Sequence, residues 1–196
     1  MNLLIQAGGN NEIDFKPVFE MLNDELAKID KSLEIVCAGG YVMQLHGYAA
    51  TMDVDAFYNS NAEIEAVIRK VGDAFQMNRP DEIWLNNSVM NLNRKPPASC
   101  YKPKYIFTHL TVNIVDLEYV LGMKLELART KDIEHVSSFI KHNNYDKPFD
   151  LLSQLRDVGF RNIDVSVLFQ AFGEAYGIEW LEKFYRDNES EIMKYS

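Results

Sequence analysis

The chain has 196 residues, 47% of them hydrophobic and 12% aromatic, a composition typical of a globular protein with one compact unit, or one unit with a helical extension. Its net charge of -9 argues against a general nucleic-acid coat, which binds through a basic face. Two cysteines, Cys37 and Cys100, are too few for a disulfide framework or a cysteine-rich zinc site and favour a reducing cytoplasm. Without a secretion signal or a membrane-length apolar run, we expect a cytoplasmic protein with no membrane contact.

The first third of the chain predicts helix, strand, glycine turn, short helix, strand and helix in that order. These elements cover residues 15–29, 34–38, 39–40, 41–46, 53–58 and 61–75. Pro17 lies near the start of the first helix, where proline is tolerated, and Asn61 is the expected N-cap of the last. This order predicts a mixed sheet with helices packed on it.

Two aspartates in the second strand carry the clearest chemical signal. Residues one apart on a strand point to the same side, so Asp53 and Asp55 could share a divalent cation. Gly39 and Gly40 lack side chains and would let a phosphate approach the backbone nearby. The pattern is typical of a nucleotidyl-transfer site. Two plainer interpretations stay open, because an Asp-x-Asp strand is often only a solvated edge and a glycine pair can simply end a strand.

The middle of the chain is less regular. Residues 83–89 fit either a strand end or a helical turn. A proline-broken loop at 94–104 carries four basic side chains and no acidic one, and is the predicted basic patch. Residues 105–107 and 110–115 are rich in β-branched and aromatic residues and predict strands.

From Asp116 onward the apolar spacing is helical. The predicted helices cover residues 116–128, 132–140, 150–155, 165–172 and 179–185, with breaks at 143–144, 148, 159 and 173–177. We therefore predict an α/β (α+β) core over residues 1–115 and a helical C-terminal region, 116–196, packed on it.

Several runs of residues resemble one known superfamily. The run at 38–47, followed by Thr51-Met52-Asp53-Val54-Asp55, resembles the GG-strand-DxD signature of minimal nucleotidyltransferases in the polymerase-β-like superfamily. Trp84-Leu85-Asn86 and the runs at 117–125 and 129–132 resemble the AbiEii-like branch of bacterial toxin nucleotidyltransferases and its uncharacterised relatives. The resemblance covers residues 34–136 with gaps, and implies a nucleotidyltransferase-like mixed sheet flanked by helices.

The resemblance also implies a Mg²⁺-dependent activity that moves a nucleoside monophosphate from a nucleoside triphosphate to an acceptor. In toxin relatives the acceptor is often RNA, especially a tRNA end; a protein acceptor and an antitoxin partner are further expectations. By position, Asp53 and Asp55 would bind Mg²⁺, and Gly39 and Gly40 would bind the triphosphate. Lys124 and Asp132 would lie near the nucleotide.

The chain also departs from the family pattern. Gly40 stands where serine is common, alanines at 49–50 replace an expected arginine, and His135 stands where an acidic residue is common. No clear third carboxylate follows, because Asn113 holds one plausible position and Asp116 lies past the strand. The alternative is therefore a catalytically degenerate nucleotidyltransferase-fold protein that binds a nucleotide or a protein. A purely structural interaction protein is a third interpretation.

Overall fold

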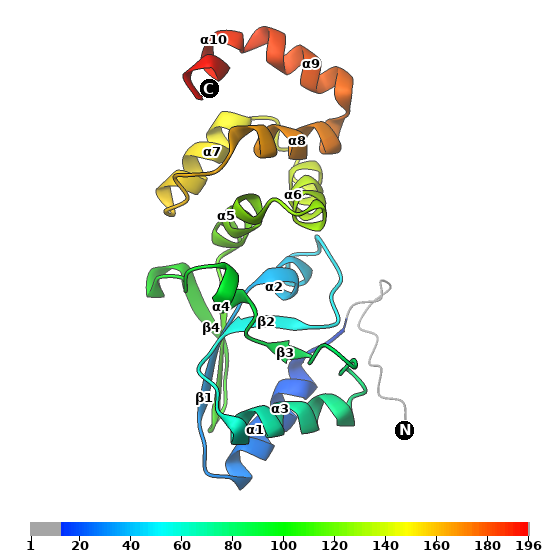
Figure 1. Cartoon of the computed structure of the whole chain (residues 1–196), viewed down its shortest axis with the longest axis vertical. Helices are drawn as coiled ribbons and strands as arrows, with labels where there is room; N and C mark the ends of the chain where they lie inside the picture. Colours follow the sequence, from blue (N-terminus) through cyan, green and yellow to red (C-terminus); the bar gives the residue numbers. More distant parts are fainter. Residues whose placement is uncertain (1–12, 196) are drawn as a thin grey trace. The chain divides into compact units, whose positions relative to one another are not determined.

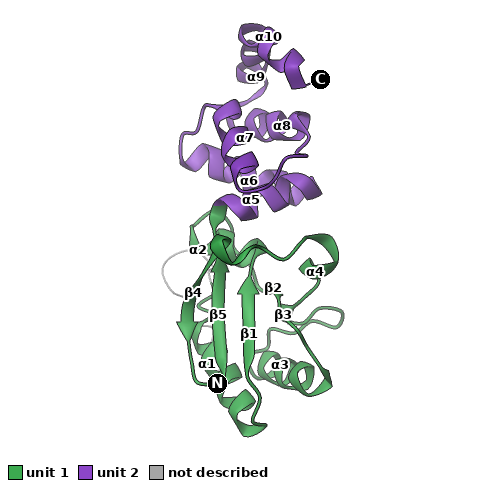
Figure 2. Ribbon diagram, turned by 90° about the vertical axis from the view of Figure 1, so that its left-hand side faces the viewer, with its two compact units in different colours: residues 1–117 green, residues 118–196 purple. Residues whose placement is uncertain are grey.

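The computed structural model of the protein describes residues 13–195. The predicted α+β class is confirmed: a five-stranded mixed sheet flanked by helices is followed by a helical region (Figure 1). The chain divides into two compact units, residues 1–117 (unit 1) and 118–196 (unit 2), shown in Figure 2. Among residues 13–195, no helix has the length and apolar character needed to cross a membrane.

Unit 1 contains the sheet, whose strand order is β3-β2-β1-β5-β4. Its elements are α1 (Lys16–Lys28), β1 (Leu33–Cys37), α2 (Gly39–Leu45), β2 (Val54–Phe57), α3 (Ala62–Ala74), β3 (Leu85–Asn86), α4 (Val89–Leu92), a 3-10 turn (Ala98–Cys100), β4 (Tyr101–Ile106) and β5 (Leu110–Val115). Strand β1 is parallel to β5 and antiparallel to β2, while β2 is parallel to β3 and β4 antiparallel to β5.

This topology brings three chain segments together at one edge of the sheet. Edge here means the side of the sheet where the ends of the strands meet, and not an edge strand. Parallel strands β1 and β5 end at the same edge, as their arrowheads show in Figure 2. Because β2 runs the other way, it begins at that edge. Gly39 and Gly40 follow β1 and form the first turn of helix α2, not a separate turn before that helix as the sequence predicted. They and the aspartates at the start of β2 therefore lie at the same edge. We call this edge, with Gly39, Gly40, Thr51, Asp53 and Asp55, the acidic edge.

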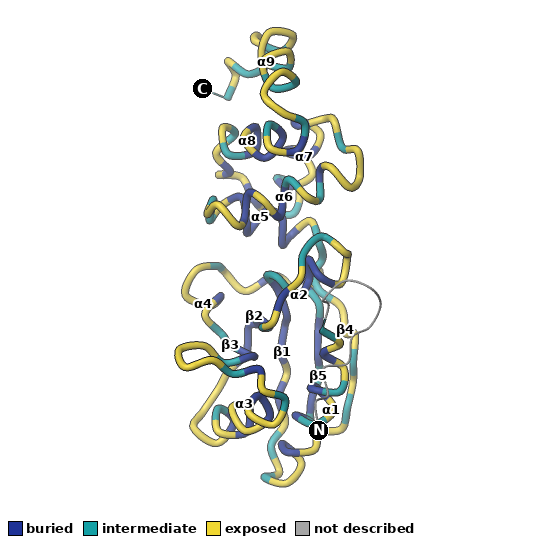
Figure 3. Tube along the Cα trace, turned by 90° about the vertical axis from the view of Figure 1, so that its right-hand side faces the viewer, coloured by how far each residue is buried: buried dark blue, intermediate teal, exposed yellow. Residues whose placement is uncertain are grey.

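The core of unit 1 lies between the sheet and helices α1 and α3. Alternate strand residues face these helices, among them Ile35 of β1 and Val112 of β5, and neither is exposed. Trp84 lies in the same core and donates its indole N–H to the carbonyl of Ile68 at 2.8 Å. Figure 3 shows the buried trace along β1 and β5. These buried apolar side chains pack closely and fix the strands against α1 and α3.

Helices α1 and α3 are also joined by charge. Glu25 of α1 accepts hydrogen bonds from Lys28 at 2.7 Å and from Lys70 of α3 at 2.6 Å. The hydrogen bonds from Lys28 and Lys70 lower the pKa of Glu25 from its ordinary value. The N-cap prediction for α3 is confirmed, because the Asn61 side chain accepts from the backbone N–H groups of Glu63 and Ile64.

Unit 2 is helical over its described residues. Its helices are α5 (Leu117–Leu127), which begins at the last residue of unit 1, α6 (Thr130–His142), α7 (Pro148–Asp157), α8 (Val165–Tyr176), α9 (Ile178–Asp187) and α10 (Glu189–Ile192), followed by a 3-10 turn (Met193–Tyr195). Trp180 joins α9 to α8 by stacking on Phe172, with 5.7 Å between ring centroids. Within α9 it also stacks on Phe184, at 5.3 Å.

Three local expectations need correction or completion. Strand β4 begins at Tyr101, inside the predicted 94–104 loop, because it pairs with β5 and tolerates Pro103 as an edge strand. Residues 83–89 contain both expected features, the short strand β3 and the start of α4. Helix α8 continues through Gly173 and ends before Gly177, whose φ is 92°.

Candidate functional site

The first glycine of the turn lies directly against an aspartate. Gly39 has a φ of 59°, which favours glycine, and a Cβ atom added to it would lie 2.5 Å from Oδ2 of Asp55. Any side chain at position 39 would therefore collide with this carboxylate. The sequence suggested that the glycines make room for a phosphate; the structure gives Gly39 a local reason, the close approach of Asp55.

The second glycine lies against Thr51, which connects the turn to the other aspartate. A Cβ atom on Gly40 would lie 3.0 Å from Oγ1 of Thr51. That hydroxyl donates to Oδ1 of Asp53 at 2.6 Å. The turn thus touches Asp55 directly and Asp53 through one side chain, so both carboxylates predicted from the sequence lie beside it.

The two aspartates differ in backbone setting. Asp55 lies within β2, where it is the register partner of Asn86 on β3. Asp53 was expected on the same strand, but it lies in a bend just before β2, and the hydrogen bond from Thr51 holds its side chain. Asn86 was not predicted as a site residue; only its place in the Trp84-Leu85-Asn86 run marked it. Neighbours in register share a sheet face, so the Asn86 amide adds a polar group beside Asp55.

Neither candidate for a third carboxylate position completes an acidic triad. Asn113 of β5 is buried, and its amide donates to Oε1 of Glu34 at 3.0 Å and to the carbonyl of Ile35 at 3.3 Å. Asp116 follows β5 and lies 3.9 Å from Nζ of Lys102. Over residues 13–195, no group of three or more His, Cys, Asp or Glu side chains is arranged to hold a metal ion.

Lys124 and Asp132 form a buried ion pair in unit 2. Nζ of Lys124 donates to Oδ1 of Asp132 at 2.9 Å, and Nε of Arg129 donates to Oδ2 at 2.6 Å. Burial raises the pKa of Asp132, but hydrogen bonds from Arg129 and the charge of Lys124 outweigh burial and leave the pKa below its usual range. The sequence predicted Lys124 and Asp132 but missed Arg129, whose signal was its position three residues before Asp132.

His135 lies one helical turn after Asp132 and is buried. Its Nδ1 atom has no hydrogen-bond partner among the residues that the structure describes. Burial, together with the charges of Lys124 and Lys131, lowers the pKa of His135 to about 4. The side chain is therefore a neutral imidazole at pH 7 in a positively charged setting.

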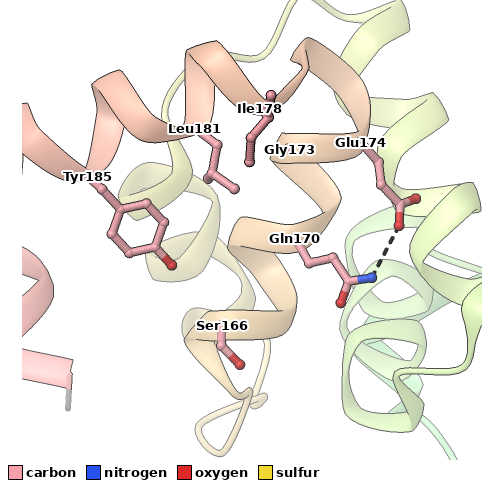
Figure 4. A pocket seen from close by; sticks show the side chains of 7 residues that line it. All are labelled: Ser166, Gln170, Gly173, Glu174, Ile178, Leu181 and Tyr185. Carbon is pink, nitrogen blue, oxygen red and sulfur yellow. Dashed lines mark hydrogen bonds between the residues drawn. The ribbon is translucent and has the colours of Figure 1, made fainter.

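Unit 2 also contains a pocket of about 300 Å³ between α8 and α9 (Figure 4). It is lined by Ser166, Gln170, Gly173, Glu174, Ile178, Leu181 and Tyr185. The Gln170 amide donates to Glu174 at 3.2 Å on one side, and Ile178 is exposed at the rim. None of the site residues predicted from the sequence lines this pocket.

Comparison of the chain with protein-family models, with curated proteins and with solved structures finds no match. Any functional assignment therefore depends on the residues and contacts of this chain.

Proposed function

We propose that the protein is a Mg²⁺-dependent nucleotidyltransferase that moves a nucleoside monophosphate from a nucleoside triphosphate to an RNA or protein acceptor. The observation that carries this proposal is the acidic edge, where the Gly39-Gly40 turn lies against Asp55 and against the Thr51 hydroxyl bound to Asp53. The close approach of Gly39 to Asp55 supports the proposal, because a side chain at position 39 would displace one of the two carboxylates.

The donor set suits magnesium. Mg²⁺ prefers carboxylate oxygens from one or two side chains, completed by phosphate oxygens and water. Asp53 and Asp55 would hold the ion, which would neutralise charge on the triphosphate. One of the two carboxylates is fixed, because Oδ1 of Asp53 accepts a hydrogen bond from Thr51. Fixed ligands of this kind favour binding because little side-chain freedom is lost.

The acceptor is proposed from surface charge, and the cellular setting from the resemblance. Lys102 and Lys104 are exposed on edge strand β4, where an RNA backbone would find positive charge. The resemblance suggests a toxin with an antitoxin partner in the cytoplasm. Lys124 and Asp132, which the resemblance assigns to the nucleotide, form a buried ion pair within unit 2, and this pair supports a structural role for them.

The proposal is tested by incubating the full chain with each α-labelled nucleoside triphosphate, Mg²⁺, and total RNA or protein extract. We expect label in an acceptor fraction with wild type and none with the Asp53→Asn/Asp55→Asn variant. The matched control is Asp150→Asn, which changes an exposed aspartate of α7 that is paired with Lys147. Label transfer that persists in the double variant would contradict the proposal.

A second candidate, a nucleotide-binding protein of this fold without turnover, is favoured by one observation. Asn113, at a position where the family pattern suggests a third carboxylate, is a neutral amide engaged by Glu34 and Ile35. Mg²⁺-dependent nucleotide binding without label transfer to any acceptor would support this candidate.

A further inference from the structure

Thr51 occupies a buried position between the glycine turn and Asp53. It is 8% exposed, and its hydroxyl donates to Oδ1 of Asp53 at 2.6 Å. A short hydrogen bond to an ionised carboxylate is among the stronger hydrogen bonds in proteins. A Cβ atom at position 40 would lie 3.0 Å from the same hydroxyl, so glycine at this position leaves room for the threonine side chain.

Thr51 is itself fixed by Gln44. The backbone N–H of Thr51 donates to Oε1 of Gln44 at 3.0 Å, and Nε2 of Gln44 donates to the carbonyl of Ile13 at 2.8 Å. Gln44 is buried and lies on α2, the helix that begins at Gly39. A continuous set of hydrogen bonds thus connects Ile13, Gln44, Thr51 and Asp53.

We infer that Thr51 is a positioning residue that orients the Asp53 carboxylate for a divalent cation, with Gln44 fixing Thr51 in turn. This inference rests on the proposed function, since it concerns the same two aspartates. The Thr51 hydroxyl donates to Oδ1 of Asp53. This hydrogen bond fixes the rotamer of the Asp53 side chain and leaves Oδ2 to face the cation. Partners of this kind typically change metal affinity by about 10 to 100-fold when they are removed.

A purely structural role for Thr51 predicts something different. If the loop needs only the shape of the side chain, valine reproduces that shape and serine does not. Because the hydroxyl also lies 3.2 Å from the carbonyl oxygen of Asp53, the melting temperature of Thr51→Val is measured as well, to detect any loss of the loop itself. The orienting role needs the hydroxyl, which serine keeps and valine lacks. The pair Thr51→Ser and Thr51→Val therefore separates the two roles.

The experiment measures Mn²⁺ binding to the full chain without nucleotide, by electron paramagnetic resonance of the free ion. We expect Thr51→Val to raise the Kd by about tenfold or more and Thr51→Ser to stay near wild type. Gln44→Met, which leaves the hydroxyl in place but removes the acceptor for the Thr51 N–H, should weaken binding to a lesser degree. The matched control is Thr108→Val, which removes an exposed hydroxyl bonded to Asn23 and should change nothing.

The outcomes distinguish this inference from the proposed function. If Asp53→Asn/Asp55→Asn loses Mn²⁺ binding while Thr51→Val and Gln44→Met bind like wild type, the inference is overturned and the metal site stands. If the double variant binds Mn²⁺ as wild type does, the proposed metal site is wrong and the inference is overturned with it. Circular dichroism of each variant verifies folding; should Thr51→Val fail to fold, Gln44→Met decides.

Discussion

His135 makes the free energy of unfolding depend on pH in a calculable way. Its pKa is about 4 in the folded chain, against an ordinary value of 6.5. Between these values the unfolded chain binds a proton that the folded chain does not, so stability falls as pH falls from about 6.5 to about 4. At about 1.4 kcal/mol for each pH unit, the full loss is about 3 kcal/mol.

Burial of His135 sets the sign of this effect, because desolvation disfavours the charged imidazole, and the neighbouring charges reinforce it. Lys124, Lys131 and Arg129 oppose protonation, whereas Asp132 favours it. The perturbation is His135→Leu, which removes the titrating group and the buried Nδ1 atom, for which residues 13–195 supply no hydrogen-bond partner. Its matched control is His46→Leu, at an exposed histidine of unit 1. We expect the His135 variant to lose about 3 kcal/mol less than wild type between pH 7 and pH 4.

The assay is urea unfolding followed by circular dichroism at a series of pH values. An NMR titration of the imidazole resonance, assigned through the same variant, measures the pKa directly. An imidazole that titrates near 6.5, or equal acid sensitivity in wild type and variant, would refute the reasoning.

The remaining predictions concern close packing and charge. Gly39→Ala should destabilise the chain by about 1–3 kcal/mol and weaken Mn²⁺ binding, because the new methyl group meets Asp55. Its control is Gly47→Ala, where φ is 77° but the space is open, and this variant should affect only stability. Gly122→Ala places a methyl group 2.2 Å from an aromatic ring and should lower the melting temperature of unit 2, as measured by calorimetry. Glu25→Gln should destabilise at pH 7, and its difference from wild type should shrink as pH falls through the lowered pKa of Glu25, because the stability that the ionised carboxylate contributes is lost there; a difference that stays constant as the carboxylate titrates would contradict this.

Local patterns in the sequence predicted much of the fold. Asn61 before an apolar helix predicted its cap, and the β-branched run at 110–115 predicted β5. The start of β4 was missed because Lys102 and Pro103 are poor strand residues; their pairing with β5 depends on partners distant in the sequence. Gly173 was read as a break because the sequence does not show that Leu181 would pack against it.

The candidate site was predictable in part. The two aspartates and the glycine pair are visible as a motif, because their spacing is local. The connection between them is not, since it depends on Gln44 reaching Thr51 across a loop and on the register of β1 with β2. Arg129 was also missed, because its role appears only when the burial of Asp132 is known.

The most direct test of the central claim is the thermal stability of the full chain with each nucleoside triphosphate, with and without Mg²⁺. The account predicts that at least one triphosphate raises the Tm only when Mg²⁺ is present, and that Asp53→Asn/Asp55→Asn abolishes the rise while remaining folded. No rise with any triphosphate, or an equal rise in the double variant, would contradict the claim that the acidic edge binds a metal and a nucleotide.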